Sequence, residues 1–124
     1  MTVADQMSDK VICVGPEENL QTARALMAEQ EFRCLSVVER GHLVGIITDR
    51  DVRLHYERRE RTTVGAIMTP NPRCITPEAS MAEAARLLLV HKIGALPVVK
   101  ESELVGIITT SDILRTFVIL AQNG

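Results

Sequence analysis

The chain has 124 residues, a formal net charge of −2 and 46 % hydrophobic residues, a composition typical of a folded globular protein. The near-neutral charge and an aromatic fraction of only 2 % argue against nucleic-acid binding, which relies on basic surfaces and stacked aromatic rings. No apolar run is long enough to span a bilayer and the N-terminus lacks the apolar core of a signal peptide, so we expect a cytoplasmic protein without membrane contacts.

The sequence repeats itself after 61 residues. Met7–Arg53 aligns with Met68–Leu114 without a gap, and 16 of these 47 pairs are identical. Typical residue frequencies would give about 3 identities by chance. The repeat predicts two domains of one fold, residues 1–60 and 64–121, joined by a linker at 60–63 and related by a pseudo-twofold axis.

Each half is predicted to fold as β-α-β-β-α. Apolar runs predict the strands, polar links of four residues predict hairpins, and Asn19 is suited to begin the first helix. The elements expected in the first half are the strand Val11–Val14, a helix after Asn19, the strands Cys34–Val38 and Leu43–Thr48, and the helix Asp49–Arg58.

The second half is predicted to follow the same order. The prolines of the segment Val64–Pro72 favour an extended lead-in, and Ser80 with Glu83 has the spacing of a capping box. The expected elements are the strand Arg73–Ile75, a helix after Ser80, the strands Ala95–Val99 and Leu104–Thr109, and the helix Ser111–Ala121. The last helix is apolar on nearly all sides, which predicts either a homodimer that covers it or a central position in the monomer.

One stretch, Gly45–Asp51, returns as Gly106–Asp112 and links the last strand of each half to the helix that follows. The N–H groups at a helix start suit an anion, and a carboxylate can accept hydrogen bonds from two hydroxyls of a diol. Thr-x-x-Asp is also the spacing of a capping box, which needs no ligand. Thr48 with Asp51 and Thr109 with Asp112 are therefore candidates for ligand binding, for helix capping, or for both.

The doubled unit, the segment Ile67–Pro70, the run Leu96–Val99 and the two glycine-to-aspartate stretches together resemble a tandem pair of cystathionine-β-synthase (CBS) domains, also called a Bateman module. The resemblance implies an α/β (α+β) fold in which two repeats pack as one module. It also implies that an adenosine ligand, such as AMP, ADP, ATP or S-adenosylmethionine, binds in the cleft between the repeats, with no obligatory cofactor.

The resemblance also assigns roles to individual residues. The ribose hydroxyls would be bound by Asp51 and Asp112, and the ribose or phosphate by Thr48 and Thr109. The base edge would be read near Cys13, Val14, Cys74 and Ile75.

The two halves differ where a phosphate would need cations. Arg33 and Arg50 belong to the first half, and the matching positions of the second half are Gly94 and Ser111. Arginine can bind phosphate oxygens through two parallel hydrogen bonds, which glycine and serine cannot. We therefore expect a phosphorylated ligand to prefer the first half, with Arg33 and Arg50 as its contacts, unless both arginines are simply surface residues.

The favoured function is a regulatory module that senses an adenine nucleotide and signals to a protein partner. The alternative is a scaffold that dimerises or docks onto a partner without a ligand. An enzyme is not expected, because the sequence has no P-loop, nucleophile–base pair or metal cluster. Cys13 and Cys74 are interpreted as small, buried, unpaired cysteines rather than as a redox or metal site.

Overall fold

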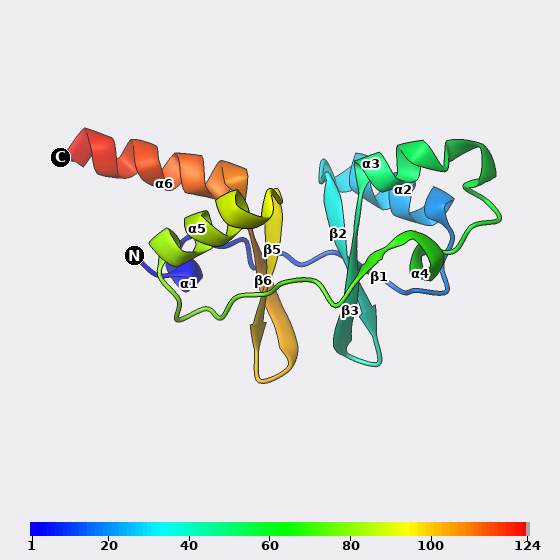
Figure 1. The fold of residues 1–124 in the computed structure, drawn as a ribbon, viewed down its shortest axis with the longest axis horizontal. Helices are drawn as coiled ribbons and strands as arrows, with labels where there is room; N and C mark the ends of the chain where they lie inside the picture. The colour runs from blue at the N-terminus through cyan, green and yellow to red at the C-terminus, as the bar shows by residue number, and fades with distance from the viewer. Residues whose placement is uncertain (124) are drawn as a thin grey trace. The chain divides into compact units, whose positions relative to one another are not determined.

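The computed structural model describes residues 1–123 and has a mixed α+β architecture with two compact units (Figure 1). One unit is Ile12–Pro72. The other joins Met1–Val11 to the chain from Arg73 onward. Within residues 1–123, no helix combines the length and the apolar character needed to cross a membrane.

The unit Ile12–Pro72 is built around a four-stranded sheet in the order β1-β2-β3-β4. Strand β1 runs parallel to β2, and the other neighbours are antiparallel. The elements are β1 (Cys13–Val14), α2 (Leu20–Gln30), β2 (Cys34–Glu39), β3 (His42–Thr48), α3 (Asp49–Leu54), the 3-10 helix η1 (Tyr56–Arg58), α4 (Val64–Ile67) and β4 (Thr69–Pro70).

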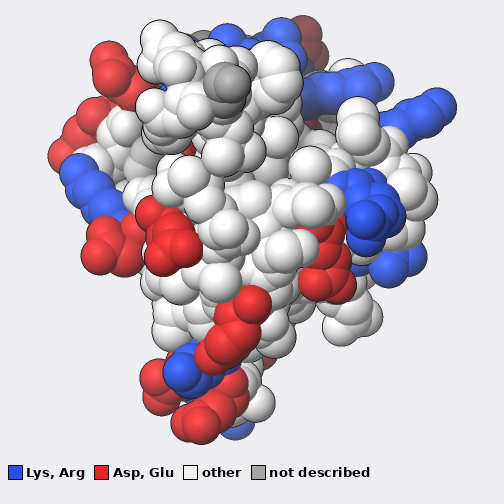
Figure 2. All heavy atoms as spheres, turned by 90° about the vertical axis from the view of Figure 1, so that its left-hand side faces the viewer, with Lys and Arg blue, Asp and Glu red and all other residues white. Residues whose placement is uncertain are grey.

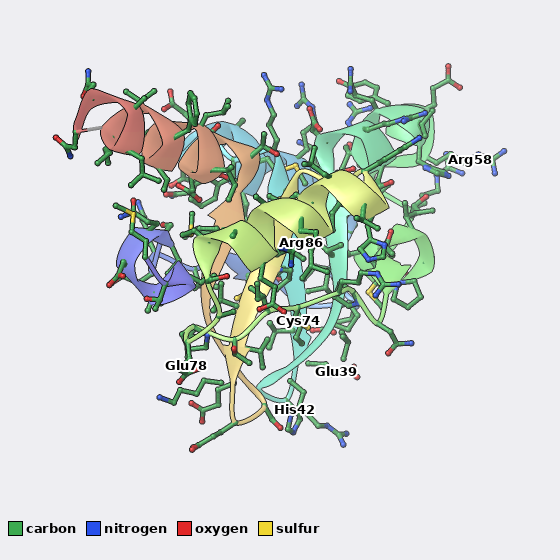
Figure 3. The ribbon with its side chains drawn as sticks, turned by 60° about the vertical axis from the view of Figure 1, so that its left-hand side comes forward. Glu39, His42, Arg58, Cys74, Glu78 and Arg86 are labelled. Carbon is green, nitrogen blue, oxygen red and sulfur yellow. The ribbon has the colours of Figure 1, made fainter. Side chains whose placement is uncertain are left out.

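Local sequence signals account for the hairpin and for the first long helix of this unit. Arg40 and Gly41 both have positive φ, 52° and 80°, which is the backbone of the tight turn favoured between twisted antiparallel strands. Glu39 and His42 lie beside this turn at the tip of the hairpin (Figure 3). The Asn19 side chain accepts a hydrogen bond from the Thr22 N–H, so the predicted N-cap of α2 is confirmed.

The second unit contains the hairpin of β5 (Ala95–Lys100) and β6 (Glu103–Thr109), with the helices α1 (Val3–Gln6), α5 (Met81–His91) and α6 (Thr110–Asn123). Ile75 bridges to Val98 in parallel fashion, and Ser8 bridges to Ile107 in antiparallel fashion. These two bridges occupy the positions that β1 and β4 have in the first sheet. In both units, the hairpin therefore has a parallel neighbour on one side and an antiparallel neighbour on the other.

The short helices α1 and α4 each pack on the half to which they do not belong by sequence. Val3 of α1 is fully buried in the core with Leu96 and Ile108, and Val64 of α4 is fully buried in the core with Ile47. The segment Val64–Pro72 is therefore not the extended lead-in predicted from its prolines. Its first turn is helical, and it contributes a buried valine and an edge strand to the preceding half.

Several predicted boundaries also need correction. The helix expected over Asp49–Arg58 stops at Leu54 and continues after His55 as the 3-10 turn η1, whereas α6 extends beyond the expected end to Asn123. The first strands are shorter than expected and reduce to β1 and the bridge at Ile75. Ser80 caps α5 by accepting from the Glu83 N–H, but the reciprocal bond of a capping box is not formed there.

Candidate functional site

Thr48 and Asp51 form a capping box where β3 ends and α3 begins. Asp51 Oδ2 accepts hydrogen bonds from the Thr48 N–H at 2.9 Å and from the Thr48 hydroxyl at 3.0 Å. The Thr48 hydroxyl in turn accepts from the Asp51 N–H at 3.2 Å. The capping interpretation of this pair is confirmed.

This geometry limits what the threonine can offer a ligand. A threonine hydroxyl has one proton to donate, and here that proton is committed to Asp51. The hydroxyl is therefore no free donor for a phosphate. Its effect is to fix the Asp51 carboxylate by holding Oδ2, and Oδ1 makes no hydrogen bond to any residue within 1–123.

Thr109 and Asp112 repeat these contacts in the second half. Asp112 Oδ2 accepts from the Thr109 N–H at 2.8 Å and from the Thr109 hydroxyl at 3.0 Å, while the Asp112 N–H lies 3.4 Å from the same hydroxyl. The difference is at the other carboxylate oxygen, because Asp112 Oδ1 forms an ion pair with Arg115. Asp112 is buried, whereas Asp51 is half-buried.

Arg115 was not among the residues selected from the sequence. The comparison of the two halves emphasised arginines that precede the aspartates and missed the one that follows Asp112 by three residues. Residues three apart on a helix are neighbours on its surface, so the spacing of Asp112 and Arg115 within a predicted helix was the available signal. The position that matches Arg115 in the first half is Leu54.

Arg33 and Arg50 are both exposed. The backbone brings Arg33 beside the capping box, since its carbonyl accepts a hydrogen bond from the Asp49 N–H at 2.9 Å. Gly94 has the same place in the second half, where its carbonyl accepts from the Thr110 N–H at 3.0 Å. Arg58, at the end of η1, extends away from the protein (Figure 3).

The residues expected near the base lie on the first strand of each sheet. Val14 and Ile75 are buried and pair with Val37 and Val98, respectively. Cys13 and Cys74 are exposed, so the expectation that they are buried was wrong. Partial burial raises the thiol pKa of both cysteines. No three His, Cys, Asp or Glu side chains of residues 1–123 gather as metal ligands would.

A separate groove of about 360 Å³ lies between α2 and α3. Its lining consists of Arg24, Met27, Ala28, Phe32, Asp49, Val52, Arg53 and Tyr56. The guanidinium groups of Arg24 and Arg59 lie 5.3 Å and 4.0 Å from the centre of the Tyr56 ring. None of the predicted ligand-binding side chains lines this groove, so it is distinct from the capping boxes.

Comparison with known proteins agrees with the doubled fold. The family model of the CBS domain matches the chain twice, over residues 3–58 and 64–119. The CBS domain-containing protein YhcV of Bacillus subtilis is 34 % identical over 115 residues, covering 90 % of this chain and 82 % of YhcV. An inosine-5'-monophosphate dehydrogenase of Korarchaeum cryptofilum is 40 % identical over 104 residues, but the match covers only 21 % of that enzyme.

Solved structures of CBS pairs superpose along nearly the whole chain. CBSX2 in complex with AMP aligns with a TM-score of 0.84 at 29 % identity, covering 97 % of this chain and 98 % of the other. The CBS domain pair of MJ0100, in complex with 5'-methylthioadenosine and S-adenosyl-L-methionine, aligns with a TM-score of 0.90 at 27 % identity over the same shares. The chain belongs to the CBS-domain family and consists of two CBS domains in tandem.

Proposed function

We propose that this protein is a regulatory module that binds an adenosine-containing ligand, with Asp51 accepting hydrogen bonds from the ribose hydroxyls. The observation that carries the proposal is the state of the Asp51 carboxylate. Thr48 holds Oδ2 in place through two hydrogen bonds, while Oδ1 has no partner within residues 1–123. A fixed, half-buried carboxylate with one open oxygen suits a diol, because little side-chain entropy is lost on binding.

The other predicted residues complete the proposed site in the first half. Thr48 orients Asp51, and Arg33 and Arg50 supply the positive charge for a phosphate. The strand around Cys13 and Val14 offers backbone groups to the base. In the second half the corresponding residues are Thr109, Asp112, Cys74 and Ile75. The AMP complex of CBSX2 and the S-adenosylmethionine complex of MJ0100 support this class of ligand, since both proteins share the fold over nearly the whole chain.

Binding would shift the protein by mass action toward the conformation that holds the ligand. A ligand that binds the folded protein stabilises it in proportion to the logarithm of its concentration, and a protein partner can read the resulting shift in population. The proposed role is therefore sensing rather than catalysis. The candidate ligands are AMP, ADP, ATP and S-adenosylmethionine.

Isothermal titration calorimetry with these four ligands tests the proposal, with GMP as a control for the base. Asp51→Asn is the informative variant, because its side-chain oxygen can keep the bond from the Thr48 N–H while an NH₂ group replaces Oδ1. Replacing a charged acceptor by a neutral amide weakens a hydrogen bond by about 1 kcal/mol, so we expect about fivefold weaker binding. The melting temperature should fall slightly, because the two bonds from Thr48 to Oδ2 are weakened as well. Failure of all four ligands to bind at millimolar concentration would refute the sensing function.

A second candidate function, assembly as a homodimer or as a scaffold, is favoured by the surface of α5 and α6. Phe117 is 66 % exposed and Leu89 is 78 % exposed. The exposed large apolar residues of the two helices are Leu89, Val90, Leu114, Phe117, Val118, Ile119 and Leu120. Figure 2 shows a largely uncharged area in the middle of the face it presents, with Lys, Arg, Asp and Glu side chains around it.

The extent of this surface is consistent with a second copy as its partner. A second copy of the chain is the partner proposed for this surface, since large exposed apolar patches mark interaction sites. Light scattering after size exclusion tests this, with Phe117→Glu expected to give monomers and Gln122→Glu, on the same helix, expected to leave the dimer intact. A monomeric wild-type protein at tens of micromolar would refute the dimer.

A further inference from the structure

The two aspartates of the repeated motif have unequal surroundings. In both halves, Oδ2 accepts two hydrogen bonds from the preceding threonine. Only in the second half is the other oxygen occupied, because Arg115 pairs with Asp112 Oδ1. The side chain of Asp112 is 7 % exposed while that of Arg115 is 68 % exposed, so the pair has a buried acceptor and a solvent-facing donor.

No cation takes the same place in the first half. The residue three positions after Asp51 is Leu54, which is 68 % exposed. Arg53 lies next to it in sequence but is directed to Asp49, with a closest nitrogen-to-oxygen distance of 4.0 Å. Asp51 Oδ1 is therefore open within the described residues, whereas the equivalent oxygen of Asp112 is blocked.

We propose that the ion pair of Arg115 with Asp112 makes the two halves unequal, so that the first half binds adenosine strongly and the second half binds it weakly. We call this ion pair the latch, because it must open before a ligand can reach Asp112 Oδ1. The proposal rests on the ribose role assigned to the aspartates in the proposed function. For the ribose hydroxyls to reach Asp112, the guanidinium must first leave Oδ1, and a bond between two charged groups is replaced by weaker bonds in which only the acceptor is charged. No such cost arises at Asp51.

Opening the latch also changes the charge that the second half presents to a ligand. When Arg115 leaves Asp112 it becomes an unpaired, solvent-facing cation on the first turns of α6. A ligand with an anionic group can offset the loss of the ion pair by attracting that cation, whereas adenosine cannot. Adenosine therefore isolates the cost of opening the ion pair, because it has no phosphate that Arg33 and Arg50 of the first half, or a released Arg115, could attract.

A titration with adenosine followed by nuclear magnetic resonance separates the two halves. The Thr48 and Thr109 amides each donate to one of the two aspartates, so each amide resonance reports on its own site. In the wild-type protein we expect the midpoint at Thr109 to lie at least tenfold above that at Thr48. Arg115→Leu, which gives the second half the residue of the first, should bring the two midpoints within about threefold.

The reciprocal variant, Leu54→Arg, places an arginine three residues after Asp51 and should weaken binding at Thr48 by about tenfold. Because Leu54 is exposed, this variant remains informative even if Arg115→Leu fails to fold. Arg58→Leu is the control for removing a surface arginine and should change neither midpoint. Equal midpoints in the wild type, or a Thr109 midpoint unchanged by Arg115→Leu, would overturn the latch. The absence of any shift at either amide with AMP or adenosine would instead refute the proposed function.

Discussion

Gly106 provides a sharp test of how the strand β6 is packed. A Cβ atom at this position would lie 2.6 Å from Met7 Sδ and 2.9 Å from the Ser8 carbonyl oxygen. Both distances are shorter than real Cβ contacts allow, so Gly106→Ala must displace the segment Met7–Ser8 or the strand itself. In the other unit, a Cβ atom added at Gly45 would likewise lie too close to the Met68 side chain and the Thr69 carbonyl oxygen.

The cost follows from what holds this segment in place. Ser8 and Ile107 exchange two backbone hydrogen bonds, both 3.0 Å long, and the Ser8 carbonyl cannot retreat without lengthening them. A backbone hydrogen bond contributes about 1 kcal/mol, and overpacking a core costs about 1–3 kcal/mol. We expect Gly106→Ala to lower the free energy of unfolding by about 2–3 kcal/mol, which corresponds to a fall in Tm of about 10 °C for a domain of this size.

Urea denaturation followed by circular dichroism measures this change. Gly94→Ala is the matched control, because a Cβ at Gly94 would meet no atom within 4 Å. Met7→Ala in the Gly106→Ala background should recover part of the loss, since it removes the sulfur contact and leaves the carbonyl contact in place. A free energy of unfolding for Gly106→Ala within about 0.5 kcal/mol of the wild type would refute the packing argument.

Further outcomes are expected for Val64, Cys34 and Asn19. Val64→Ala should lower the free energy of unfolding by about 2 kcal/mol, measured with urea, because it empties part of a core in which Val64 is fully buried. Burial, with the Asp49 carboxylate adding to it, raises the pKa of Cys34 to about 11. Only about 0.1 % of the Cys34 side chains are therefore thiolate at pH 8, and mass spectrometry should show that Cys34 is alkylated last among the cysteines. Since that pKa is raised on folding, the contribution of the thiol to stability should be lost as pH rises from 9 to 11. Asn19→Ala should cost about 1 kcal/mol in thermal unfolding by removing the acceptor for the Thr22 N–H.

The sequence predicted the elements whose signals are local. The hairpin β5–β6 was expected over Ala95–Val99 and Leu104–Thr109 and extends only one residue further into its turn at each side. The apolar run gave the strands, and the four polar residues between them left room only for a tight turn. The Asn19 cap was equally local, because its hydrogen bond spans three residues.

The placement of α1 and α4 was not predictable in this way. Four residues make less than two helical turns, so neither helix has a periodic pattern of its own. Each is stabilised by contacts distant in sequence, such as the Val3 N–H to the Ala79 carbonyl and the Val64 N–H to the Glu18 carbonyl. One signal was available: Thr2-Val3 and Thr63-Val64 are identical at the same offset of 61, which extends the repeat backward beyond Met7.

The repeated glycine-to-aspartate stretch explains why a binding site is hard to infer from a motif alone. Each of its shared residues has a structural role without any ligand. The glycine leaves room for a methionine side chain and a backbone carbonyl that pack against it, and the second isoleucine is buried in the core. The threonine and the aspartate together cap a helix. Folding alone therefore accounts for both copies of the motif. What separates the copies is the second carboxylate oxygen, which is open at Asp51 and paired at Asp112. The residue that decides this difference, Arg115 or Leu54, lies outside the motif, so the functional distinction between the halves depends on the helix that follows each motif.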